Sequence, residues 1–118
     1  DNVMALNNLA FLLADTGGNL EDAMSMIRKA LKSSGEMPGT LDTLGWIYFK
    51  QHALDSAAQV FASLTRKYPA NPTCHYHLAL AMLGKGDRAQ AKTELQVALA
   101  NNPSTQEVTE IRKALAGL

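Results

Sequence analysis

The sequence is poor in several features on which large classes of proteins depend. One cysteine among 118 residues excludes a fold held together by internal disulfides. Eleven basic residues are balanced by eleven acidic ones, so no basic surface points to a nucleic-acid partner. No apolar run approaches the roughly 18–20 residues of a membrane-spanning helix, and we expect no direct membrane contact from this segment.

The sequence also lacks a targeting signal. It opens on Asp1 rather than on methionine, so we expect a piece of a longer chain, and a cytoplasmic and a periplasmic location in a bacterium are equally compatible with it. Aromatic residues make up only 6% of the chain, whereas alanine and leucine are frequent. This composition favours helices.

The breaks between apolar segments recur at a fixed interval. A distance of 34 residues separates Pro69 from Pro103 and Ala57 from Ala91. A period of this length indicates a repeat architecture. The segments between breaks have the length of short helices, and their apolar residues recur at i, i+3, i+4 and i+7. The pattern predicts helices at about 3–15, 19–33, 39–50, 54–67, 72–84, 87–101 and 104–116.

The residues at the breaks fit helix ends. Asn71 and Pro72 form an N-cap followed by proline at the first helical position, where its missing N–H costs nothing. Ser104 and Glu107 have the spacing of a capping box. Glycines supply the left-handed turns of the first and third repeats, whereas His52 takes that place in the second.

The second repeat carries the pattern most fully, in Leu41, Leu44, Gly45, Tyr48, Ala57, Phe61 and Pro69. These residues resemble the tetratricopeptide repeat, and the chain is similar to the C-terminal part of a longer bacterial repeat array. The resemblance implies an all-α fold, a right-handed superhelix (α-solenoid) of three antiparallel helix pairs plus a C-terminal capping helix. We therefore predict a single domain over 1–118, with repeats at about 3–37, 38–71 and 72–103 and the capping helix at 104–116.

Small residues occupy the places where two helices of a pair have to cross closely. On the first helices these are Ala10, Gly45 and Ala79. Larger side chains are expected to fill the space beside them.

The stretch TCHYHLAL holds three residue types that often bind zinc. On a helix, at about 100° per residue, His75 and His77 point to opposite faces. Cys74 and His77 could reach one ion together, but no further ligand lies within a few residues. We expect no metal and no cofactor, with His75 in a packing position and His77 facing a groove. Known catalytic motifs are absent, so we expect no enzyme.

The resemblance implies that the first helix of each pair lines a concave groove for an extended or helical peptide. An apolar ridge of Phe11, Trp46 and Leu80 is expected there, although packing of Trp46 between neighbouring first helices is the alternative. The candidate binding residues are Asn7, Asn8, Phe11, Asp42, Thr43, Trp46, Lys50, Tyr76, His77 and Leu80.

The first helix has no helix pair before it in the sequence. Two alternatives to groove binding follow: the segment is the architectural end of a longer solenoid, or it forms a homodimer through the uncapped N-terminal helix pair. The sequence predicts a protein or peptide partner and does not identify it.

Overall fold

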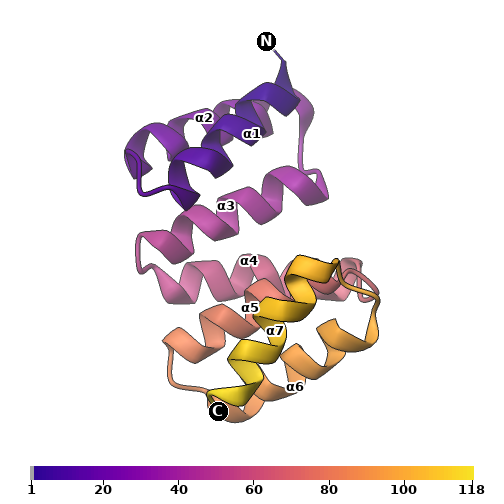
Figure 1. Cartoon of the computed structure of the whole chain (residues 1–118). Helices are drawn as coiled ribbons and strands as arrows, with labels where there is room; N and C mark the ends of the chain where they lie inside the picture. The colour runs from indigo at the N-terminus through magenta and orange to yellow at the C-terminus, as the bar shows by residue number, and fades with distance from the viewer. Residues whose placement is uncertain (1) are drawn as a thin grey trace. The chain divides into compact units, whose positions relative to one another are not determined.

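Residues 2–118 are described by the computed structural model and fold into seven helices joined by short turns, with no strand among them (Figure 1). The helices are α1 (Val3–Asp15), α2 (Leu20–Ser34), α3 (Pro38–Lys50), α4 (Leu54–Lys67), α5 (Pro72–Gly84), α6 (Arg88–Ala100) and α7 (Thr105–Ala116). Every boundary lies within one residue of the predicted one. The predicted all-α class is confirmed.

Side-chain caps explain why five of the helices begin where they do. In each case an oxygen of the preceding residue accepts a hydrogen bond from a backbone N–H of the first turn. Such a cap contributes about 1 kcal/mol. The capping residues are Asn2, Asn19, Asn71, Asp87 and Ser104.

The turns that follow α1, α3 and α5 share one backbone geometry. Gly17, His52 and Gly86 occupy equivalent places and have φ angles of 76°, 61° and 85°. The prediction that His52 replaces a turn glycine is confirmed. A side chain in this left-handed region is disfavoured, because its Cβ approaches the following carbonyl oxygen.

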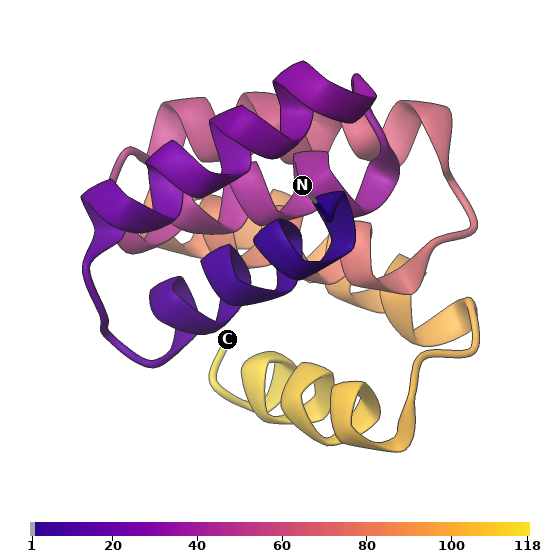
Figure 2. The same cartoon turned by 90° about the horizontal axis from the view of Figure 1, so that it is seen from above.

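Contacts divide the chain into two compact units, and the boundary falls inside α4, between Val60 and Phe61. In the first unit, α1 runs antiparallel to α2, and α3 packs against both (Figure 2). Its core lies along the α1–α2 crossing. The fully or almost fully buried residues there are Ala10, Ala14, Ala23, Ile27 and Ala30.

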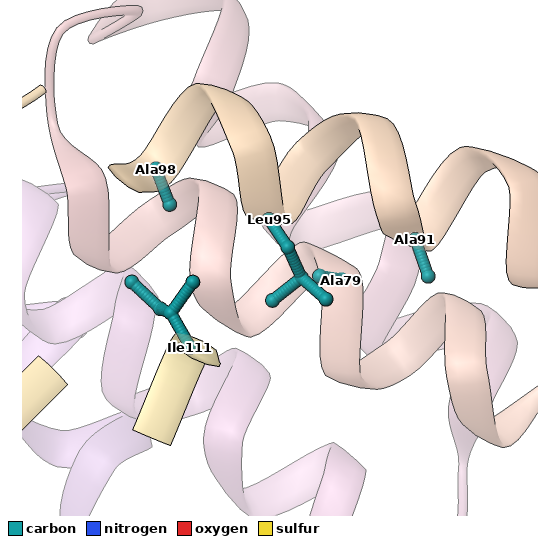
Figure 3. Close-up of a cluster of buried hydrophobic side chains, with 5 residues drawn as sticks. All are labelled: Ala79, Ala91, Leu95, Ala98 and Ile111. Carbon is teal, nitrogen blue, oxygen red and sulfur yellow. The ribbon is translucent and has the colours of Figure 1, made fainter. Parts of the chain in front are cut away.

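The second unit has a core of the same kind at the α5–α6 crossing. Ala79, Ala91, Leu95 and Ala98 are buried there, and Ile111 of α7 points into the same cluster (Figure 3). Burying an isoleucine side chain contributes roughly 1.5–3 kcal/mol. As predicted, α7 therefore covers apolar surface of the last helix pair. The single domain over 1–118 stays a prediction.

The turn after α3 gives the first testable prediction. Replacing His52→Gly should raise the free energy of unfolding by about 0.5–1 kcal/mol, because glycine removes the strain at a φ of 61° while adding some freedom to the unfolded chain. Urea denaturation monitored by circular dichroism measures the change. Gln51→Gly, one residue earlier at a φ of −79°, is the control and should destabilise. An unchanged or lowered midpoint for His52→Gly would contradict the account.

Candidate functional site

A stack of aromatic rings joins α1 to α3 in the first unit. The rings of Phe11 and Trp46 lie 6.3 Å apart between centroids, and those of Trp46 and Phe49 lie 5.2 Å apart, with interplanar angles of 27° and 24°. The ammonium of Lys50 is 5.2 Å from the centre of a Trp46 ring, within cation–π distance. Three of the predicted site residues, Phe11, Trp46 and Lys50, are therefore brought together.

Trp46, the central ring of this stack, does not form part of an exposed apolar ridge. Trp46 is only 8% exposed, so its geometry is that of a residue packed between neighbouring first helices. Phe11 is half-buried and Lys50 keeps part of its surface exposed. The accessible part of the cluster is thus formed by Phe11, Phe49 and Lys50, and the buried ring of Trp46 packs against all three.

Two residues predicted to project into the groove are buried instead. Thr43 is 3% exposed, and its hydroxyl donates to the carbonyl of Gly39 at 3.1 Å. His77 is 7% exposed, and its ring lies 5.3 Å from that of Phe61 on α4. The prediction of exposed positions for Thr43 and His77 was wrong, because a helix between two others has a second buried face that periodicity alone does not reveal.

His75 is buried, as its predicted packing role requires, and both of its ring nitrogens also have a polar partner. Its Nδ1 lies 2.7 Å from Oε1 of Glu94, and its Nε2 lies 2.7 Å from the carbonyl oxygen of Pro69. The Glu94 carboxylate and the Pro69 carbonyl can each accept a hydrogen bond from a ring nitrogen of His75 that carries a hydrogen. His75 therefore ties α5 to α6 and to the turn after α4.

Five of the eight residues of the TCHYHLAL stretch are buried in the second unit. Cys74 is 2% exposed, next to the engaged ring of His75. Within residues 2–118 no group of three or more His, Cys, Asp or Glu side chains is placed to hold a metal ion. In the same part of the chain, no helix has the length and apolar character needed to cross a bilayer.

Tyr76 and Leu80 lie in the second unit and are both half-buried. Tyr76 packs against the core cluster that contains Ile111. Burial raises the pKa of Tyr76 above 10.0, and the negative charges of Glu110 and then Glu107 on α7 raise it further. Periodicity did not identify these two carboxylates as neighbours of Tyr76, although Glu110 follows Tyr76 by one repeat length of 34 residues.

The remaining predicted site residues belong to the first unit. Asn7 and Asp42 are half-buried, and Asn8 is exposed. Sequence reasoning missed Phe49, whose spacing of three residues from Trp46 on α3 was the available signal.

The raised pKa of Tyr76 predicts a pH dependence. The neutral phenol is favoured in the folded chain, so its contribution to stability is complete below pH 10 and is lost as the pH rises through the folded pKa. Titration of the tyrosinate absorbance band should contain a component that is absent in Tyr76→Phe and lies above that of the urea-unfolded chain. Glu110→Gln should move this component partway down. A Tyr76 component at or below pH 10 would contradict the assignment.

Comparison with known proteins places this geometry in a family. The family profile described as Tetratricopeptide repeat matches residues 48–116. A TPR repeat-containing protein of Pseudomonas aeruginosa is 38% identical over 69 residues, which are 58% of this chain and 12% of that protein. The chain thus spans only about an eighth of the length of this relative.

Solved structures show the same fold. The translocator chaperone SycD of the type III secretion system of Yersinia enterocolitica has TM-scores of 0.83 and 0.81 in two crystal structures, at 23% and 24% identity, over 98% of this chain and 89% of that one. A third structure, SycD in complex with a peptide of the translocator YopD, has a TM-score of 0.78 at 24% identity, over 97% and 89% of the two chains. The chain belongs to the tetratricopeptide repeat family.

Proposed function

We propose that the chain is a non-catalytic interaction module that binds a peptide segment of a partner protein along the first helices of its repeats. The observation that carries this proposal is the aromatic stack of Phe11, Trp46 and Phe49 with Lys50 beside it. Aromatic anchors backed by a rigid core are characteristic of the strongest points of protein interfaces.

The chemistry around the stack suits an extended peptide. Phe11 offers an accessible apolar ring whose position is held by Trp46, so binding would immobilise few side chains. Asn7 lies one helical turn before Phe11, and Asp42 lies one turn before Trp46. These polar groups flank the apolar surface and can orient a peptide backbone.

The structural likeness supports the same kind of partner. One of the SycD structures holds a peptide of another protein, YopD, on a fold that this chain shares. The proposed surface consists of Asn7, Phe11, Asp42 and Lys50 in the first unit, with the ring of Trp46 packed behind Phe11. In the second unit, Tyr76 and Leu80 stay predicted contact residues.

A selected peptide tests this proposal. Peptides enriched from a random library on the immobilised chain should quench or shift the fluorescence of Trp46, the only tryptophan of the chain. Phe11→Ser should weaken binding by about tenfold or more, because it removes the accessible anchor of the stack.

The matched control is Leu9→Ser on the same helix, at a position that takes no part in the ring stack. It should leave the affinity for the selected peptide unchanged. Equal losses for Phe11→Ser and Leu9→Ser, or failure to enrich any peptide, would contradict binding at this surface.

A second candidate function is favoured by an apolar face of α1. Leu9 and Leu12 on this face are 46% and 55% exposed. Of their equivalents one and two repeats later, Ile47, Leu78 and Ala81 are at most 2% exposed and Leu44 is half-buried. The same face of the first helix is thus covered in later repeats and uncovered in α1, which supports a role as a contact surface toward another helix pair.

For the isolated chain we infer that this contact is made by a second copy. Residues 3–14 contain no charged side chain, so two copies of the face can meet without like-charge repulsion. Leu9→Glu should convert a concentration-dependent dimer to a monomer in analytical ultracentrifugation. A wild-type chain that stays monomeric at the highest attainable concentration would contradict self-association and leave a helix pair of a longer chain as the partner.

A further inference from the structure

A cavity of about 390 Å³ opens between the N-terminal ends of α1 and α3 in the first unit. Its volume lies within the roughly 300–1,000 Å³ of typical small-ligand pockets. Met4 and Met37 form its accessible walls and are 73% and 50% exposed. Methionine side chains are flexible and polarisable, and they adapt to apolar ligands of different shape.

Among residues 2–118, none of those that line the cavity carries a charged side chain. Besides the methionines, Val3 and Gly39 line the cavity, together with four uncharged polar residues, Asn2, Asn7, Ser34 and Thr40. A charged ligand group would lose its hydration there without gaining an opposite charge. The cavity therefore selects an uncharged, largely apolar group.

One polar atom in the cavity wall lacks a partner. Oδ1 of Asn7 is buried and accepts no hydrogen bond from residues 2–118. The neighbouring hydroxyl of Thr40 is already engaged, since it accepts from the backbone N–H of Met37 at 3.2 Å and faces the Met37 carbonyl at 3.0 Å. A buried acceptor without a donor is unfavourable and calls for an explanation. Asn7 lines the cavity, so a rotation of its side chain would present this oxygen to an N–H group of a ligand.

The second unit shows which side chains occupy the corresponding positions there. In the repeat register, Asn7 corresponds to Tyr76 and Gly39 corresponds to Glu107. Tyr76 packs there against the core, and Glu107 is close enough to raise its pKa. In the first unit both positions carry smaller side chains. The space that a tyrosine ring takes in one unit is left open in the other.

Gly39 is not required by the backbone. Its φ lies outside the left-handed region, and a Cβ added there would meet only Nδ2 of Asn7, at an ordinary 3.9 Å. A larger residue could therefore occupy this helix position. The absence of a side chain at Gly39 leaves this part of the cavity open.

We propose that this cavity binds one large uncharged side chain of a peptide, such as leucine, methionine or phenylalanine, while a backbone N–H of that peptide donates to Oδ1 of Asn7. The assignment rests on the peptide-binding function proposed above and names the residue class that anchors the peptide.

Small probes test the cavity without knowledge of the partner. N-acetyl-phenylalaninamide and N-acetyl-leucinamide should shift the methyl resonances of Met4 and Met37, with dissociation constants roughly in the millimolar range for ligands of this size. The methyl groups of Met24, Met26 and Met82 lie outside the cavity wall and serve as internal controls.

Two further probes test which part of the ligand the cavity recognises. N-acetyl-glycinamide has the N–H groups without the apolar side chain, and toluene has a ring without an N–H. Both should bind about tenfold more weakly than the phenylalanine probe or not measurably. Equal binding of N-acetyl-glycinamide would overturn the apolar pocket. Equal binding of toluene would overturn the peptide assignment.

Variants of the cavity provide the decisive comparison. Gly39→Leu should abolish the shifts at Met4 and Met37, whereas Gly39→Ala, a small substitution at the same place, should leave probe binding within about twofold. Asn7→Leu should weaken the probe about five- to tenfold without lowering the melting temperature, because it removes an unpaired buried acceptor. Shifts that persist in Gly39→Leu, or full affinity in Asn7→Leu, would overturn the proposal.

The same variants separate this inference from the function on which it rests. A library-selected peptide that depends on Phe11 yet binds Gly39→Leu as well as wild type would overturn the anchor site while supporting the peptide-binding surface. Probe binding at Met4 and Met37 without any selectable peptide would overturn the function and support the pocket alone.

Discussion

The close crossing of the two helices in a pair decides how the remaining residues pack. It requires a small residue at the crossing, and Ala10, Ala23, Ala79 and Ala91 are completely buried there. Alanine has the smallest side chain that still favours a helix, so the backbones of the two helices approach closely. Ile27, and the residues at the same place in the other repeats, fill the space beside the alanines. Once the crossing is fixed, the rotation of each helix about its axis is fixed too. The faces left for binding are therefore a consequence of core packing.

The same register gives different surfaces when different residues occupy it. Asn7 and Gly39 leave a cavity where Tyr76 and Glu107 stand close together in the other unit. Trp46 stacks against Phe11, whereas the equivalent position in the next repeat holds an aliphatic residue, Leu80. Function in such a repeat protein thus lies in departures from the repeat, because the shared positions are already committed to packing.

Local patterns predicted the helices, their caps and the left-handed turn at His52 correctly, because these features depend on residues within a few positions of one another. The candidate site was predicted only in part. Periodicity places His77 opposite His75 but does not say that Phe61 covers it. The cavity is harder to predict from the sequence, because it arises where small residues on two helices come together only in the folded chain.

Peptide binding by the first helices of the first unit, through the face that carries Phe11, can be mapped by NMR. Backbone amide and Trp46 indole shifts are measured with and without a library-selected peptide. We expect the largest shifts around Phe11 on α1 and Trp46 on α3, with Leu9 and Leu12 little changed. Shifts confined to Leu9 and Leu12, with none on α3, would contradict it.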